Sequence, residues 1–135
     1  MIAEQLALYL QANGVAVQNT TLFLGFQPDS PDNCVTVYDE TSPIIEESHA
    51  LDVDQFGVQV LVRNISYSEA RDKTMEIHRL LAGFGGVPFV DDGDIVHALF
   101  IDVPPAPIGR DDNGRSEWSV HYRMRVKSTG DLYRS

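Results

Sequence analysis

Two short acidic clusters come nearest to a metal-binding pattern in this sequence. They are Asp91-Asp92-Gly93-Asp94 and Asp111-Asp112-Asn113-Gly114. Calcium needs roughly six to eight oxygen ligands around one point, and a helix-loop-helix calcium loop supplies them at alternating positions and ends in a glutamate. Neither cluster has that spacing. Both suit tight turns, because Asp and Asn tolerate left-handed backbone and glycine adopts it freely. We therefore interpret both clusters as turns and predict no metal site.

The histidines are the other residues that could bind a metal or move a proton. They are His49, His78, His97 and His121, and no two are spaced to share one face of a helix. No nucleophile elbow, P-loop or dinucleotide-binding glycine pattern is present either. The single cysteine, Cys34, lies in an apolar–polar run and is expected to be a small buried hydrophobe. We predict that the protein is not an enzyme and has no catalytic, cofactor-binding or metal-binding residue.

A row of basic side chains on the last predicted strand is out of keeping with the rest of the chain. The apolar residues of this segment alternate, and they are Trp118, Val120, Tyr122, Met124 and Val126. Successive side chains of a strand face opposite sides, so the other face carries Ser119 and four potential cations. The row is either a solvated face, a contact with nucleic acid, or a subunit interface at which bases meet a neighbour's acids. The proposed interface residues are His121, Arg123, Arg125 and Lys127.

The composition suits one soluble domain with an acidic surface. The chain has 135 residues, of which 43% are hydrophobic, so residues 1–135 are predicted to form one domain around a single core. The formal net charge of -10 repels phosphate and argues against a free nucleic-acid-binding protein. No apolar stretch is long enough to span a bilayer, and the start has no positively charged leader segment. We therefore expect no membrane partner and expect synthesis and assembly in a cytoplasm.

Two amphipathic helices are predicted from apolar residues at helical spacing. The first covers roughly residues 2–13 and ends at Asn13-Gly14. The second begins with a capping box, Ser66-Tyr67-Ser68-Glu69, and ends at Gly83. The inner stripe of the second helix consists of Ala70, Thr74, Ile77 and Leu81.

The remaining ordered segments have the pattern of strands. They are residues 21–26, 33–38, 56–63, 95–103 and 118–127. The proline-bearing turn between the first two suggests a hairpin, and Pro104-Pro105 is expected to end the fourth. Asp112-Asn113-Gly114 is a hairpin-type turn before the last strand. The predicted fold class is therefore α+β, with a mixed, mainly antiparallel sheet and two helices packed on it.

Residues 39–55 are acidic and have no helical or strand periodicity. They contain six acids and neither lysine nor arginine. We interpret this segment as a solvated acidic loop; the alternative is a segment that becomes ordered only against a partner.

Three segments of the chain carry a resemblance to a known family. They are Leu22–Asn33, Val58–Asn64 with the helix that follows it, and Ile108–Arg115, which leads into the last strand. In this order, and together with the first helix, they resemble the phage minor capsid proteins related to the tail terminators of long-tailed phages. The resemblance covers nearly the whole chain, and none of the segments is a catalytic signature.

The resemblance implies a structural virion protein of a tailed phage or prophage. Such a subunit closes into a ring, a hexamer, that caps the tail tube at its final length and then docks to the head connector or stopper protein. Its implied partners are copies of itself, the tail tube protein and the connector, while DNA passes through the lumen without specific binding. Its implied location is the tail or neck of the virion, after assembly in the host cytoplasm. The alternatives are a head-completion or tail-tube subunit of the same particle, a metal-dependent hydrolase using Asp91, Asp92, Asp94 and a histidine, or a ligand-binding module of host origin.

Overall fold

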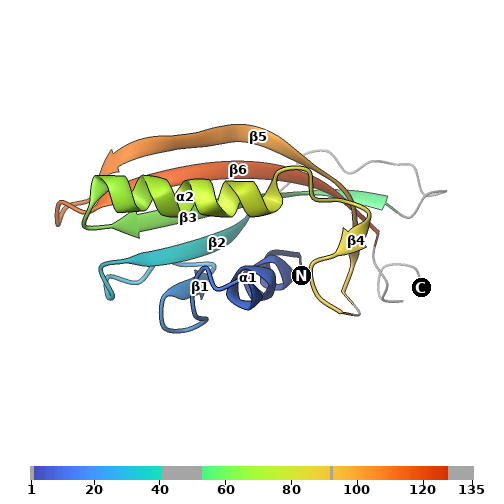
Figure 1. The fold of residues 1–135 in the computed structure, drawn as a ribbon, viewed down its shortest axis with the longest axis horizontal. Coiled ribbons are helices and arrows are strands. Elements are labelled where there is room, and N and C mark those ends of the chain that lie inside the picture. Colours follow the sequence, from blue (N-terminus) through green and yellow to red (C-terminus); the bar gives the residue numbers. More distant parts are fainter. Residues whose placement is uncertain (1, 41–52, 92, 128–135) are drawn as a thin grey trace.

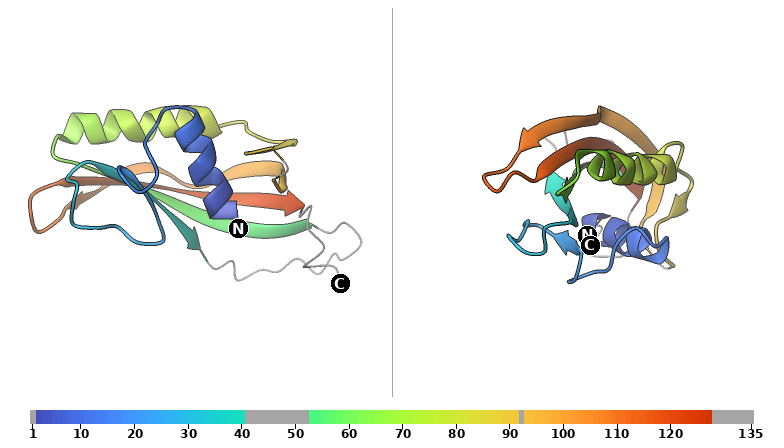
Figure 2. Two further views of the ribbon diagram at one scale, coloured as in Figure 1. Left: turned by 90° about the horizontal axis from the view of Figure 1, so that it is seen from below. Right: turned by 60° about the vertical axis from the view of Figure 1, so that its left-hand side comes forward.

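A six-stranded curved sheet with both helices on one face makes up the fold (Figure 1 and Figure 2). The computed structural model describes residues 2–40, 53–91 and 93–127. In chain order the elements are α1 (Ile2–Ala12), β1 (Leu22–Leu24), β2 (Cys34–Glu40), β3 (Val53–Asn64), α2 (Tyr67–Leu81), β4 (Val87–Pro88), β5 (Ile95–Arg110) and β6 (Ser116–Lys127). The strands lie in the order β1-β2-β3-β6-β5-β4, and every neighbouring pair except β1–β2 is antiparallel. The predicted α+β class, with a mainly antiparallel sheet, is confirmed.

The core lies between the helices and the sheet face that they cover. The alternating apolar residues of β6 are buried there, as the sequence predicted, and the side chain of Tyr122 is completely enclosed. α1 adds Leu6 and Leu10, which are also fully buried. α2 contributes the predicted stripe of Ala70, Thr74, Ile77 and Leu81. Burial of one large aliphatic side chain contributes about 1.5–3 kcal/mol, so these few residues hold both helices on the sheet.

Both ends of α2 follow the sequence signals. Ser66 is the N-cap, and its hydroxyl accepts a hydrogen bond from the backbone N–H of Glu69 at 3.3 Å. At the other end the backbone N–H of Ala82 donates to the carbonyl of His78, and Gly83 follows with a φ of 79°. That left-handed backbone is costly for any other residue, so glycine ends the helix here. In the part of the chain described, neither helix has the length and apolarity needed to cross a membrane.

The loop between β4 and β5 holds α1 in place. The side chain of Gln5 donates to the carboxylate of Asp94 at 3.0 Å and accepts from the backbone N–H of the same residue at 2.8 Å. A Cβ at Gly93 would lie 2.9 Å from Val90 Cγ2 and 3.0 Å from the Val90 carbonyl oxygen, so this tight turn favours glycine. Beside it the aromatic rings of Tyr9 and Phe89 lie 5.3 Å apart. The N-terminal helix is therefore docked through polar and aromatic contacts as well as through its leucines.

The predicted hairpin of the first two strands is wrong. β1 and β2 do pair, with Leu22 opposite Val35, but they run parallel. The chain between them, residues 25–33, returns to the start of β1 before β2 begins, so both strands run in the same direction. Arg63 fixes this return, because its guanidinium donates to the backbone carbonyls of Pro31 and Asp32.

The prediction that Pro104-Pro105 ends the fourth strand is also wrong, because β5 continues to Arg110. β4 pairs only with Ile95 and Val96, so the rest of β5 is an edge strand. An edge strand can include proline, which lacks an N–H, wherever the missing donor would face away from the sheet or lie in a bulge. Register shifts in this strand fall on both sides of the prolines.

The acidic segment predicted as a loop is shorter than expected. Asp39 and Glu40 complete β2, and β3 already begins at Val53. Residues 41–52 lie outside the described residues, so the choice between a solvated loop and a partner-ordered segment stays a prediction.

Candidate subunit interface

The basic row of β6 lies on the sheet face opposite the helices, which we call the outer face. His121 and Arg123 are half-buried there, and Arg125 and Lys127 are exposed. β6 occupies the middle of the sheet, between β3 and β5, so the row crosses the centre of the outer face. The predicted alternation of β6 is confirmed, and its role as an interface stays a prediction.

Two members of this row are paired with acids of their own chain. His121 Nδ1 lies 3.0 Å from Glu40 Oε1, and Arg123 Nε lies 3.2 Å from Asp102 Oδ1. The second ring nitrogen of His121 is 3.2 Å from the hydroxyl of Ser119. Partly exposed ion pairs contribute only about 0.2–1 kcal/mol each. The acids that face the row thus come in part from the chain itself, whereas the interface hypothesis had a neighbouring subunit supply them.

The absence of a side chain at Gly57 lets Glu40 reach His121. Glu40 on β2 is opposite Gly57 on β3, which in turn is opposite Arg123 on β6. A Cβ at Gly57 would lie 3.2 Å from the Cβ of Glu40, which is a tight contact. The carboxylate therefore extends across β3 to the next strand. Because this contact spans two strand pairings, no local sequence pattern could have indicated it.

Exposed apolar side chains of β5 flank the basic row. Phe100 lies opposite Arg123, and Val103 lies opposite His121, both on the outer face. Their exposed fractions are 50% and 44%. Apolar surface gathered beside charged residues is typical of protein interaction sites. Sequence reasoning missed these two residues, because the apolar residues of 95–103 do not indicate which face of the strand lacks a cover.

A second cluster joins two of the segments that carry the family resemblance. The side chain of Arg115 is only 7% exposed and contacts three carboxylates. Its nitrogens lie 2.8 Å from Asp29 Oδ1, 3.2 Å from Asp32 Oδ1 and 2.7 Å from Asp111 Oδ2. Hydrogen bonds between ionised groups are stronger than those between neutral groups. Arg115 therefore ties the loop of residues 25–33 to the β5–β6 turn.

This cluster favours the charged forms of its members. Hydrogen bonding to Asp29 raises the pKa of Arg115 further above its ordinary value. Desolvation acts to raise the pKa of Asp111, but hydrogen bonds from Arg115 and Asn113 outweigh it and hold that pKa below the ordinary 3.8. The contribution of Asp111 to stability is therefore complete above the pKa that its carboxyl group has in the unfolded chain. It is lost as the pH falls through the lower pKa that this group has in the folded protein. The link that Arg115 makes between the loop of residues 25–33 and the β5–β6 turn therefore stays intact at neutral and mildly acidic pH.

Replacement of Arg115 by methionine is expected to release the loop of residues 25–33 while leaving the sheet folded. The guanidinium is the group that binds both Asp29 and Asp32, and methionine keeps much of its aliphatic length. Amide hydrogen exchange within residues 25–33 should become faster. Arg110→Met is the matched control, because Arg110 is exposed and, among the described residues, its side chain donates a hydrogen bond to the Gly114 carbonyl at 3.3 Å and forms no ion pair with Asp29 or Asp32. Equal exchange in both variants would show that Arg63 holds the loop without help.

The acidic clusters lie in turns. In the first, the backbone N–H of Gly93 donates to the Val90 carbonyl at 3.0 Å; Asp92 lies outside the described residues. In the second, the N–H of Gly114 donates to the Asp111 carbonyl at 3.0 Å, as the predicted turn requires. Within residues 2–40, 53–91 and 93–127, no group of three or more His, Cys, Asp or Glu side chains is placed to hold a metal ion.

The other candidate residues of the sequence analysis, the remaining histidines and Cys34, lie in different parts of the fold. His78 lies on α2, and its Nδ1 is 3.0 Å from the hydroxyl of Tyr122 in the core. Burial raises the pKa of that tyrosine. His97 is exposed on β5, and His49 lies outside the described residues. Cys34 is buried, as predicted, and burial raises the pKa of its thiol.

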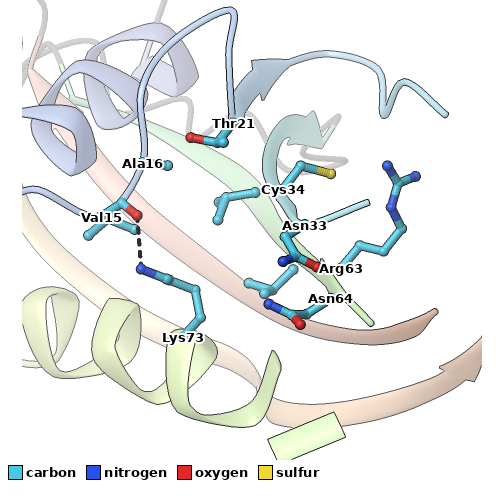
Figure 3. Close-up of a pocket in the computed structure, with 10 residues that line it drawn as sticks. Val15, Ala16, Thr21, Asn33, Cys34, Arg63, Asn64 and Lys73 are labelled. Carbon is cyan, nitrogen blue, oxygen red and sulfur yellow. Dashed lines mark hydrogen bonds between the residues drawn. The ribbon is translucent and has the colours of Figure 1, made fainter. Parts of the chain in front are cut away.

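A pocket of about 180 Å³ lies between the α1–β1 loop, the ends of β2 and β3, and α2 (Figure 3). Its walls combine aliphatic side chains such as Val35 and Val62 with polar ones such as Asn33 and Asn64. At its rim Lys73 donates to the carbonyl of Val15 at 2.9 Å and lies 3.6 Å from Glu76. The guanidinium of Arg63 extends away from Lys73 (Figure 3) to bind the loop carbonyls described above. Both basic side chains of this pocket, Lys73 and Arg63, therefore bind backbone carbonyls of the same chain.

Comparison with known proteins gives the family. The sequence profile described as "Bacteriophage tail terminator protein" matches residues 9–128. A search of curated protein sequences finds no match. Among solved structures, a chain from the "Virion of native gene transfer agent (GTA) particle" is similar in fold, with a TM-score of 0.56 and 13% sequence identity over 94% of this chain and 92% of that one. Because the family profile covers most of the chain, including α2 and all six strands, the chain belongs to the bacteriophage tail terminator family, whose members are structural proteins of the phage virion.

Proposed function

We propose that this protein forms a closed ring of six identical subunits that terminates the tail tube and joins it to the head connector or stopper protein. The basic row of β6, on the outer face of an otherwise acidic chain, is the observation that carries this proposal. Its residues are His121, Arg123, Arg125 and Lys127. Surfaces perform this role, so it needs no catalytic, cofactor or metal site.

The uneven distribution of charge over the subunit surface suits a ring. When one surface of a subunit binds a different surface of the next copy, the contact repeats until rotation closes it. The basic row offers one such surface, and the acidic remainder of the chain offers the other. Six copies of a chain with a formal charge of -10 also repel phosphate, so DNA passes the lumen without specific binding. The subunit is assembled in the host cytoplasm and then resides in the tail or neck of the virion.

Reversal of the basic row tests this proposal. The triple change Arg123→Glu, Arg125→Glu and Lys127→Glu should leave the monomer folded but weaken ring assembly or tail attachment. One exposed pair contributes about 0.2–1 kcal/mol, so a single change matters little, whereas like charges at every joint of a ring add up. Sedimentation and electron microscopy report the assembly, and circular dichroism reports the fold.

A second pair of variants separates the position of the charges from their number. Arg125→Glu with Lys127→Glu reverses two exposed charges of the row, and Arg71→Glu with Arg79→Glu reverses two exposed charges on α2. Only the first pair should weaken the ring. If the triple variant assembles as the wild type does, the row is a solvated face. Rings that stack into tubes without any other protein would instead identify a tail-tube subunit.

A further inference from the structure

Exposed apolar side chains gather at the two opposite edges of the sheet. One group, which we call the β5 edge, comprises Phe100, Ile101, Val103 and Ile108, with exposed fractions between 44% and 57%. The other, which we call the β1 edge, comprises Val17, Leu24 and Phe26, with exposed fractions between 36% and 63%. Figure 1 shows β5 along one long side of the molecule and β1 along the other. Each edge therefore offers exposed apolar side chains that a partner could cover.

Neither edge is suited to extension by another strand. β5 contains Pro104, Pro105 and Pro107, which have no backbone N–H to donate. β1 has only three residues, and its start is already bridged by Gln18 of the preceding loop. A partner at either edge must therefore bind through side chains, and the apolar groups are the side chains available there.

The charges beside the two edges are opposite. Residues 1–62 contain no lysine or arginine, and the two arginines that reach the loop of residues 25–33, Arg63 and Arg115, are buried. The exposed charged side chains of β1, β2 and this loop are therefore acids, among them Asp29 and Asp39. The β5–β6 side carries the basic row, of which Arg125 and Lys127 are exposed. Two β5 edges brought together would set base against base, and two β1 edges would set acid against acid. Charge complementarity thus favours one edge of each kind at a contact.

We propose that the β1 edge of one copy of this protein docks against the β5 edge of the next copy. The inference rests on the proposed ring and names the two surfaces that form each joint. Phe26 and its apolar neighbours on one subunit cover Phe100 and its neighbours on the other, while the acids beside β1 face the bases of β6. Such a joint is head-to-tail, which is the arrangement that a closed ring needs.

Two complementary variants test the assignment. The first, Phe100→Ser with Val103→Ser, removes apolar surface from the β5 edge; the second, Val17→Ser with Phe26→Ser, removes it from the β1 edge. Neither changes the charge. Each variant alone should lose the ring and remain a monomer by sedimentation. An equal mixture should give a one-to-one dimer, because the intact β1 edge of the first variant binds the intact β5 edge of the second. Ile65→Ser with Leu8→Ser, which alters apolar residues of comparable exposure elsewhere, should still form the ring.

The other outcomes contradict the assignment. Dimers formed by either variant alone would show a two-fold contact between like edges. A mixture that stays monomeric, from a protein whose wild type forms rings, would show that the joint lies elsewhere while leaving the ring itself intact. A wild-type chain that stays monomeric at every concentration would contradict the ring and this inference together. Circular dichroism of each variant confirms that its fold is retained.

Discussion

Replacing Trp118 by alanine is expected to lower the free energy of unfolding by about 3–5 kcal/mol. The residue is only 7% exposed, and its indole lies 5.5 Å from the aromatic ring of Tyr67 at the start of α2. In the sheet it is flanked by Val62 on β3 and Pro107 on β5. Loss of the indole leaves a cavity where two strands and a helix meet. Urea denaturation followed by circular dichroism measures the change.

Trp118→Phe is the companion variant, and its loss should be about 1.5 kcal/mol or less. Within the described residues the indole N–H has no hydrogen-bond partner, so phenylalanine sacrifices some volume but no bond. If alanine and phenylalanine destabilise the protein equally, cavity formation is not the cause of the loss.

Leu6→Ala is expected to destabilise the protein by about 2–5 kcal/mol. Leu6 is fully buried and anchors α1 against the sheet. Small domains have only about 5–15 kcal/mol of stability in total, so this single change removes a large fraction of it. Thermal and urea unfolding of the purified variant give the value.

Leu8→Ala is the matched control, since it removes the same atoms from the same helix. Leu8 is 37% exposed. The loss there should be well under half of that at Leu6, because much of the side chain already contacts water. Equal losses would mean that α1 is docked in solution through a different face from the one described here.

Patterns confined to one element were predicted well from the sequence. The 3.6-residue period gave both helices, and the capping box placed the start of α2 at its observed residue. Alternation along 118–127 assigned each of these residues to the correct face of β6, which begins two residues earlier, at Ser116. These patterns succeed because the partner of each residue, whether core or solvent, is the same along the whole element.

Properties that depend on distant residues could not be predicted in the same way. The parallel pairing of β1 and β2 depends on Arg63, which binds the intervening loop from another strand. The length of β5 depends on its lying at an edge, which follows from the strand order and not from residues 95–110 themselves. Proline content alone therefore gave the wrong end for this strand.

The candidate interface likewise combines a feature that one strand predicts with contacts that depend on distant residues. Alternation was enough to place Arg123 and His121 on one face. Their partners Asp102 and Glu40 lie on two other strands and reach the row only in the folded sheet. The apolar neighbours on β5 were likewise invisible until the pairing of β5 with β6 was known.

The position of β6 has a consequence for the order of folding during synthesis. This strand is the last of the described fold, yet it lies in the middle of the sheet, between β3 and β5. Until residues 116–127 leave the ribosome, no strand joins β3 to β5, so the strand edges that β6 pairs with in the complete sheet stay open. The closing step joins segments far apart in the chain, which makes it slow compared with helix formation. The core of the described fold is therefore complete only after β6 has been translated, and a chain that stops before residue 116 lacks the strand that joins β3 to β5.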